Sequence, residues 1–207
     1  MMPLPKELTL IVAATQSMGI GLNGTLPWTG LRREMAYFAR VTKRLEENAP
    51  PQSLNAVIMG RKTWDSIPTK FRPLRDRLNV VISRSHPETV EIVDKNTLCK
   101  ARSLEAALAY LSGRQESISK VFVIGGAQIY AAALELPETK RCLITRILSE
   151  FECDTVFPLA LTGTKTETAW MRKSQVEMDS WVGETVPEGV QEENGTKYSF
   201  EMWEKTG

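Results

Sequence analysis

The feature that most constrains the fold is a set of short apolar runs, rich in β-branched residues, with helices predicted between them. The runs lie at Leu8–Ala14, Asn55–Met59, Leu78–Ile82 and Val121–Ile124, and Arg141–Leu148 is a further strand pattern. Helices are predicted at 31–44, 104–111 and 127–134, with Ser103 as the N-cap of the second. Apolar runs without polar alternation are typical of strands buried on both faces, so this order of elements predicts a mostly parallel sheet flanked by helices.

The pattern changes after Phe157-Pro158. Trp170–Val176 and Tyr198–Trp203 are predicted strands, and the Gly-, Pro- and Glu-rich segment between them contains no long helix. A connection of this kind favours antiparallel pairing. Because the chain has no repeat, low-complexity tract or linker, we predict a single α/β domain over residues 1–207. Its sheet is expected to be mixed and mostly parallel, with a C-terminal antiparallel edge.

The composition excludes several classes of protein. The chain is 42% hydrophobic and 25% charged with a net charge of +1, so it lacks the basic excess expected for binding nucleic acid or an acidic membrane. Three widely spaced cysteines and one histidine argue against a zinc site or a disulfide framework and fit a reducing compartment. We therefore expect no metal and no membrane or nucleic-acid partner, and a cytoplasmic location, with mitochondria and the nucleus as alternatives.

Glu34 is the most informative charged residue. Four residues of the helix that begins near residue 31 form an apolar stripe: Leu31, Met35, Phe38 and Thr42. Glu34 points into this stripe, whereas Arg32 and Arg33 lie on other faces. Burying an unpaired carboxylate costs several kcal/mol or raises its pKa. From the residues alone two interpretations stay open: a carboxylate at the border of a helix start, or a buried acid that awaits a ligand with paired N–H donors.

Three glycine-containing stretches are candidates for ligand binding. Gly60 precedes Arg61 and Lys62 at the start of a short helix, where cations oppose the helix dipole unless an anion joins them; two solvated charges are the alternative. Gly125-Gly126 separates a strand from a helix, which lets backbone amides approach a pyrophosphate, although close strand–helix packing explains it equally well. The loop Thr15–Leu26 has three glycines and the length of a functional loop or lid.

These features belong to a longer, ordered set of motifs. The set is Ile11-Val12-Ala13, Met18-Gly19-Ile20-Gly21, Leu26-Pro27-Trp28, Glu34, Tyr37-Phe38, Met59-Gly60-Arg61-Lys62-Thr63-Trp64, Ser66-Ile67-Pro68, Arg72-Pro73-Leu74, Ile124-Gly125-Gly126 and Asp154-Thr155-Val156-Phe157-Pro158. In this order the motifs resemble those of dihydrofolate reductase, and the strand at Tyr198–Lys205 also matches. Each motif is modest alone, but the ordered set is very specific. The longer loops and Ser180-Trp181-Val182-Gly183 resemble eukaryotic, fungal members of the family.

The resemblance implies reduction of 7,8-dihydrofolate to 5,6,7,8-tetrahydrofolate by hydride transfer from NADPH, in one-carbon metabolism. The predicted catalytic residues are Glu34, Trp28 and Thr145. Glu34 would accept bonds from the amino group and ring N–H of the pterin, Thr145 would support its carboxylate, and Trp28 would hold a water. From the residues alone, Thr145 is better explained as an ordinary strand threonine, and Trp28 as a core residue, than as catalytic residues. Because Glu34 would lie at the opposite edge of the pterin from the nitrogen that gains a proton, we expect a water to deliver that proton.

The resemblance also assigns the binding residues. The predicted substrate-binding residues are Ile11, Val12, Glu34, Met35, Phe38, Ile67, Phe71, Leu74, Arg77, Ile124, Tyr130 and Thr145. The predicted cofactor-binding residues are Ala13, Gly19, Ile20, Gly21, Leu22, Asn23, Gly24, Thr25, Gly60, Arg61, Lys62, Thr63, Ser83, Arg84, Ser85, Arg102, Gly125, Gly126, Ala127, Gln128, Ile129 and Tyr130. Arg77 would bind the α-carboxylate of the substrate's glutamate, and a surface arginine is the alternative. Asp154 would support the Gly19–Thr25 loop, and a plain turn residue is the alternative.

Two other functions compete with this interpretation. One is another pteridine or pyrimidine reductase of the same fold, which the Leu26-Pro27-Trp28 motif, Glu34 and Arg77 argue against. The other is a catalytically silent nucleotide-binding or interaction protein. The chain departs from many animal members at Met35 and at Thr29-Gly30, which bears on inhibitor selectivity rather than on the reaction. The expected partners are dihydrofolate and antifolate inhibitors, and the expected state is a monomer.

Overall fold

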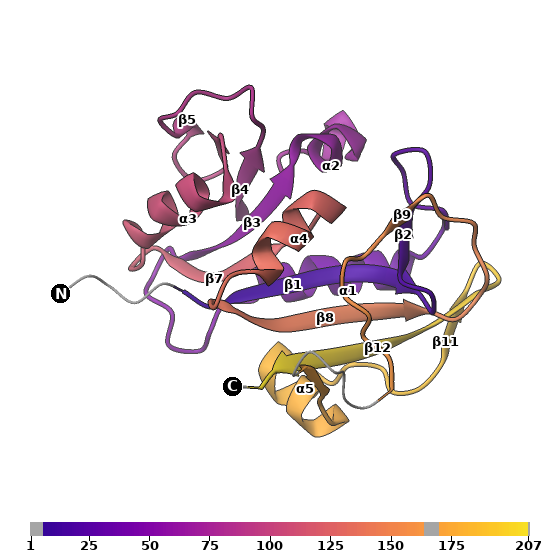
Figure 1. Cartoon of the computed structure of the whole chain (residues 1–207). Coiled ribbons are helices and arrows are strands. Elements are labelled where there is room, and N and C mark those ends of the chain that lie inside the picture. Colours follow the sequence, from indigo (N-terminus) through magenta and orange to yellow (C-terminus); the bar gives the residue numbers. More distant parts are fainter. Residues whose placement is uncertain (1–5, 164–169, 207) are drawn as a thin grey trace. The chain divides into compact units, whose positions relative to one another are not determined.

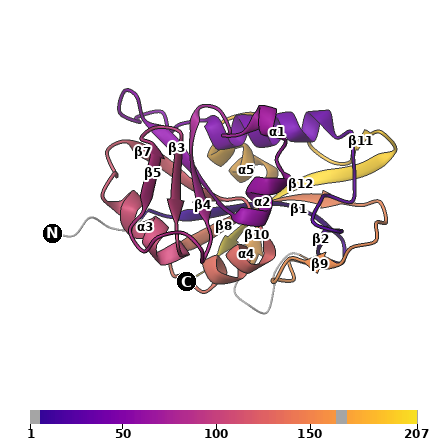
Figure 2. The ribbon, with the colours of Figure 1, turned by 90° about the horizontal axis from the view of Figure 1, so that it is seen from above.

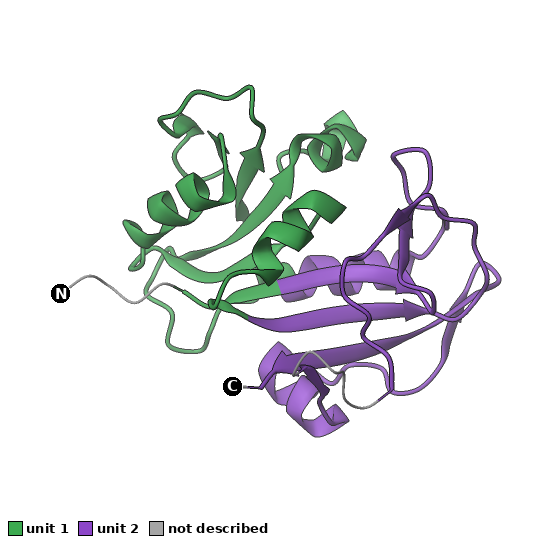
Figure 3. Cartoon of the chain, in the orientation of Figure 1, with its two compact units in different colours: residues 1–9, 42–139 green, residues 10–41, 140–207 purple. Residues whose placement is uncertain are grey.

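Figure 1 shows the computed structural model of the chain, in which residues 6–163 and 170–206 are described. The chain divides into two compact units (Figure 3): residues 1–9 with 42–139 form unit 1, and residues 10–41 with 140–207 form unit 2. Three elements contain residues of both units, namely β1 (Leu8–Thr15), α1 (Arg32–Lys43) and β8 (Thr139–Ile147). The single domain over residues 1–207 stays a prediction.

Unit 1 contains a mostly parallel group of strands in the order β7-β3-β4-β6-β5. These strands are β3 (Leu54–Gly60), β4 (Arg77–Ile82), β5 (Glu91–Asp94), β6 (Leu98–Ala101) and β7 (Ile118–Val123). The pairs β7–β3, β3–β4 and β4–β6 are parallel, and β3 and β4 lie side by side in Figure 2; the edge strand β5 is antiparallel to β6. Nearly every residue of β3, β4 and β7 is buried, which confirms the fully buried strands predicted from their apolar sequences.

The helices of unit 1 begin where the sequence predicts. They are α2 (Arg61–Ser66), α3 (Leu104–Ser112) and α4 (Ala127–Leu134), with a 3-10 turn η1 (Thr69–Phe71) after α2. The hydroxyl of Ser103 accepts a hydrogen bond from the amide of Ala106, so Ser103 is the N-cap of α3 as expected. Helix α4 contacts β3 and β7, which fixes the glycine pair before it between a strand and a helix.

Unit 2 contains the antiparallel part of the sheet. Its strands are β1, β2 (Gly19–Gly21), β8, β9 (Thr155–Val156), β10 (Trp170–Arg172), β11 (Gln191–Glu193) and β12 (Thr196–Lys205). β12 pairs antiparallel with β8, β10 and β11, which confirms the predicted antiparallel edge. The register places Phe200 opposite Thr145, and β2 pairs separately with β9.

One segment of unit 2 differs from its prediction. The strand expected at Trp170–Val176 ends at Arg172. The eight-residue helix α5 (Gln175–Val182) lies in the connection to β12, where the sequence predicted no long helix. The helix begins with a capping box, in which Ser174 accepts from the Glu177 amide and Glu177 accepts from Ser174, and it ends at Gly183 with φ 81°. The apolar residues of 170–176 suggested a strand, whereas the S-x-x-E capping signal decides the structure. The predicted loop at 15–26 likewise contains β2.

Among the described residues, no helix is both long and apolar enough to cross a membrane.

Candidate active site

Glu34 is buried in unit 2 and bonded to Thr145. Its side chain lies on α1 with a residue exposure of 8%, and the hydroxyl of Thr145 on β8 donates to Glu34 Oε1 at 2.9 Å. Arg32 and Arg33 are exposed, as predicted. Burial raises the pKa of Glu34 to about 6; the Thr145 hydrogen bond opposes this, and the charge of Glu193 adds to it. The interpretation as a border carboxylate is therefore wrong, and Glu34 is a buried acid that titrates near neutral pH.

The buried face of α1 differs from the predicted stripe. Leu31, Tyr37, Val41 and Thr42 are buried together with Glu34, and Phe38 is half-buried. Met35 is 54% exposed, so its predicted place in the stripe is wrong. Successive residues of a helix are about 100° apart, and a face centred on Glu34, Tyr37 and Val41 leaves Met35 at its border.

Three other predicted residues of unit 2 lie on β1. Ile11 and Val12 are buried on β1, and Ala13 is half-buried. Trp28 is buried and meets the ring of Phe151 edge to face, with ring centroids 5.7 Å apart. Trp28 is thus a packed core residue in this unit, and its role in holding a water stays a prediction.

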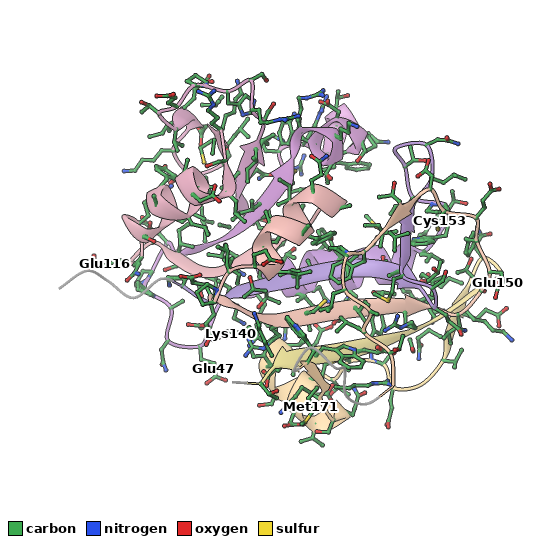
Figure 4. All side chains as sticks on the ribbon, in the orientation of Figure 1. Glu47, Glu116, Lys140, Glu150, Cys153 and Met171 are labelled. Atoms are coloured by element: carbon green, nitrogen blue, oxygen red, sulfur yellow. The ribbon has the colours of Figure 1, made fainter. Side chains whose placement is uncertain are left out.

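The glycine loop of unit 2 is bonded to the segment around Asp154. The Asn23 amide donates to Asp154 Oδ2 at 2.8 Å, and the Asp154 amide donates to the Gly21 carbonyl at 2.9 Å. The bond from the Asn23 amide, together with one from Thr155, lowers the pKa of Asp154. A Cβ at Gly19 would lie 2.5 Å from the sulfur of Cys153, which Figure 4 labels, so glycine is required there. The predicted support of this loop by Asp154 is confirmed over the plain turn residue.

A buried ion pair that sequence analysis missed lies at the start of the same loop. Arg146 on β8 binds Glu201 on β12 with Nη2 and Oε2 3.1 Å apart, and Trp203 Nε1 donates to the same oxygen at 2.9 Å. Arg146 also donates to the carbonyls of Thr15 and Leu161 and to the sulfur of Met18. A charged residue between Thr145 and Ile147 of a buried strand was the available signal.

The glycine pair of unit 1, Gly125-Gly126, is hydrogen-bonded to the end of β3. The Gly60 amide donates to the Gly125 carbonyl at 2.8 Å, and Gly125 has φ 122°. A Cβ at Gly125 would lie within 3.5 Å of Tyr130 and 3.4 Å of Thr63. The backbone conformation therefore requires glycine at 125, whereas the contacts of a Cβ there would be ordinary, and Gly126 is the N-cap of α4. The contacts of α4 with β3 and β7 confirm strand–helix packing here, and binding of a pyrophosphate at the start of α4 stays a prediction.

The predicted phosphate-binding residues of unit 1 gather at one edge of its sheet. Register aligns Gly60 with Ile82 and Ile82 with Ala101, so the carboxyl ends of β3, β4 and β6 are neighbours. The predicted residues follow directly: Arg61, Lys62 and Thr63 after β3, Ser83, Arg84 and Ser85 after β4, and Arg102 after β6. The four cationic side chains are exposed. Ligands of open α/β sheets bind at this edge, so the arrangement fits a phosphate-bearing ligand.

Two of these cations have carboxylate neighbours. Arg61 pairs with Asp65 at 3.0 Å and Arg102 with Glu88 at 3.1 Å, all four side chains being at least half exposed. Exposed pairs of this kind contribute little stability, and a phosphate with several charge-assisted bonds can compete with them.

Arg77 of unit 1 is buried rather than on the surface. Its Nη1 donates to the hydroxyl of Thr42 and its Nε to the carbonyl of Arg75, both at 2.9 Å. Burial lowers the pKa of Arg77 to about 10, although nearby Asp76 opposes this. A guanidinium held among neutral oxygens is suited to a carboxylate ligand.

The remaining predicted residues of unit 1 differ in exposure. Ile67, Leu74, Ile124, Ala127 and Ile129 are half-buried and Tyr130 is buried, whereas Gln128 and Phe71 are exposed, the latter by 58%.

Comparison with known proteins identifies the family. The dihydrofolate reductase family model matches residues 7–205. The chain is 43% identical to the dihydrofolate reductase of Pneumocystis carinii, covering 96% of each chain, and 41% identical to that of Cryptococcus neoformans, covering 95% of this chain and 94% of the relative. A solved Schistosoma mansoni dihydrofolate reductase superposes with a TM-score of 0.74 at 32% identity, covering 97% of this chain and 99% of that one. The predicted fold class is confirmed: a mixed, mostly parallel sheet with antiparallel edge strands and flanking helices. The chain belongs to the dihydrofolate reductase family, a family of oxidoreductase enzymes.

Proposed function

We propose that this protein reduces 7,8-dihydrofolate to 5,6,7,8-tetrahydrofolate with NADPH and so supplies one-carbon metabolism. The observation that carries the proposal is the buried Glu34 carboxyl with its hydrogen bond from Thr145. The bond to Oε1 fixes the carboxyl plane, which leaves Oε2 and the second lone pair of Oε1 for two parallel N–H donors. A pterin edge with an amino group beside a ring N–H supplies such donors.

Glu34 would orient and polarise the pterin rather than protonate it directly. Its pKa of about 6 lets the carboxyl exist in both forms near neutral pH. We propose that a water supplies the proton to the ring nitrogen. Arg77 would bind the glutamate α-carboxylate of the substrate, because its guanidinium is buried among neutral oxygens.

The sheet edge of unit 1 would hold the cofactor. Bound NADPH supplies the hydride. The amides at the start of α4, which follows Gly125 and Gly126, would bind a pyrophosphate, and the exposed Arg61, Lys62, Arg84 and Arg102 would provide donors for a further phosphate. A dinucleotide with an extra phosphate therefore fits better than one without it, which is why we propose NADPH rather than NADH.

The test of the proposed reaction is loss of NADPH absorbance when dihydrofolate is added, with NADH as the comparison. We expect rapid loss with NADPH and little with NADH. Folded protein that binds NADPH without turnover would favour a related reductase or a silent binding protein. Because the three cysteines are free, we also propose a reducing, cytoplasmic location.

The double substitution Arg61→Ala/Arg84→Ala should reduce the preference for NADPH over NADH roughly tenfold or more, because each side chain is expected to make a charge-assisted bond to the extra phosphate. The measurement is kcat/KM for both cofactors, and the preference of the unaltered protein should weaken with added salt. Lys95→Ala, in the exposed turn after β5, is the matched control. Full discrimination by the double variant would contradict the proposal.

A further inference from the structure

The first turn of α1 is capped from a distant hairpin. The helix begins at Arg32, and the residues before it, Gly30 and Leu31, have no side-chain acceptor for the first amide groups. Glu193 of β11 provides two: its Oε1 accepts from the Arg33 amide at 2.9 Å and its Oε2 from the Glu34 amide at 3.3 Å. A carboxylate about 160 residues away in sequence therefore replaces the usual local N-cap.

The β11–β12 hairpin is itself held in place. Asn194 and Gly195 at its turn have φ of 47° and 72°, and Glu193 pairs with Thr196 in the register. The Asn194 amide group donates to the Thr29 carbonyl at 2.9 Å, just before α1. Arg33 Nη2 donates to the Glu192 carbonyl at 2.6 Å. These bonds fix the hairpin against the start of α1.

Tyr198 completes the arrangement from β12. Its hydroxyl donates to Glu193 Oε2 at 2.5 Å, and the Tyr198 side chain is buried. Burial alone would raise the pKa of Glu193, but the bonds from Tyr198 and from the two α1 amides outweigh it and lower the pKa overall. Glu193 is therefore ionised at neutral pH, and its charge acts on the carboxyl of Glu34, whose own amide it binds.

We propose that Glu193 is a positioning residue for Glu34: it caps α1 through the amides of Arg33 and Glu34 and places a fixed negative charge beside the Glu34 carboxyl. The inference rests on the proposed function for its effect on turnover, but not for its effect on Glu34 itself. It assigns a function to a residue in a hairpin that none of the sequence motifs includes.

The sign of the electrostatic effect follows from the groups around Glu34. Arg33 and Tyr37 share its helix, Glu193 faces it from β11, Tyr198 lies behind Glu193 on β12, and β8 contributes the uncharged Thr145. Removing the Glu193 charge takes away a repulsion from ionised Glu34. It also leaves the positive end of α1 uncompensated, which favours ionised Glu34 too. Both effects lower the pKa of Glu34.

The experiment measures this pKa directly, by carbon-13 NMR of protein labelled at the glutamate side-chain carboxyl. The Glu34 signal is assigned by its loss in Glu34→Gln. We expect Glu193→Gln to lower the pKa of Glu34 by roughly 0.5 or more, and to shift the acidic limb of the pH profile of kcat in the same direction. Glu192→Gln, which removes an exposed charge one residue away, is the matched control and should change neither.

Each outcome bears on the inference separately from the reaction. An unchanged Glu34 pKa in Glu193→Gln, or an equal fall in Glu192→Gln, would overturn the inference even in a fully active enzyme. Absence of dihydrofolate turnover in the unaltered protein would contradict the proposed function and leave the NMR test intact. Glu193→Asp keeps the charge but has a shorter side chain, so it provides a second test if Glu193→Gln does not fold. In this variant the amide hydrogens of Arg33 and Glu34 should exchange roughly fivefold faster; unchanged exchange would also overturn the inference.

Discussion

Replacing Glu34 with glutamine should lower kcat/KM for dihydrofolate at pH 7 by roughly 10²–10³-fold. Glutamine keeps the volume of the side chain and an oxygen that can accept from Thr145, so the fold around α1 should not change. It offers the substrate one acceptor and one N–H group, whereas the pterin edge requires two acceptors. Steady-state kinetics with NADPH measure the effect.

Cofactor binding provides the control for this variant. Because the phosphate edge belongs to β3, β4 and β6, NADPH affinity measured by fluorescence titration should stay the same in Glu34→Gln. A Glu34→Gln protein that keeps full activity at neutral pH would contradict the function proposed for the carboxyl.

The same substitution should make the ligand-free protein more stable at alkaline pH. The pKa of Glu34 is raised from 4.5 in the unfolded chain to about 6 in the folded protein, so the folded state binds more protons between these values and loses stability as pH rises through them. Above pH 6 the buried, ionised Glu34 lowers the free energy of unfolding by about 2 kcal/mol, and near pH 4 this loss is absent. Urea unfolding should show a higher free energy of unfolding for Glu34→Gln than for the unaltered protein at pH 8, and no difference at pH 4. A loss of stability at pH 8 would contradict this prediction, because it would show that hydrogen bonds and charges around Glu34 outweigh the cost of burying its carboxylate.

Replacing Arg146 with methionine should lower the free energy of unfolding by about 3–5 kcal/mol. The substitution leaves the carboxylate of Glu201 buried, with Trp203 Nε1 as a close donor and the guanidinium of Arg172 3.7 Å away. It also removes the donors to Thr15 and Leu161. The measurement is the urea midpoint at constant m value.

A double variant separates the buried charge from general packing. In Arg146→Met/Glu201→Leu neither charge remains, so a large part of the lost stability should return, as is usual when both members of a buried pair are replaced by apolar residues. If the double variant were as unstable as the sum of its single changes, the loss would come from packing and not from the unpaired carboxylate.

The long buried strands and most helices could be predicted because their signals are local, whereas short strands such as the fully exposed β5 carry no such signal. Runs such as Asn55–Met59 need no partner to identify them as buried strands, and Ser103 identifies the start of α3 by itself. Helix α5 was missed because the apolar residues of 170–176 outweighed a capping box four residues long. Met35 was wrongly placed on the buried face of α1 because helical spacing locates such a face only to within one residue. Tertiary packing decides which residues lie at the centre of the face.

The candidate site could be predicted where a residue was out of place in its own segment. Glu34 on an apolar face and glycines beside strands are such residues, and the family motifs supplied their partners. Glu193 and the pair Arg146–Glu201 were missed because their contacts join positions 55 to 160 residues apart. No periodicity encodes such contacts; only the register of β11 and β12 with their neighbours brings the groups together.

The dependence of α1 on β11 and β12 has a consequence for synthesis of the chain on the ribosome. Residues 32–43 are made early, but Glu193 and Tyr198, which complete the first turn of α1, are translated about 160 residues later. At ordinary rates of translation this delay is on the order of ten seconds. A nascent or truncated chain that ends before residue 191 also lacks the strand that pairs with β8 beside Thr145. Competence for catalysis should therefore arise only after residues 191–205 have been translated, so chains that end before them would not act as weakened enzymes.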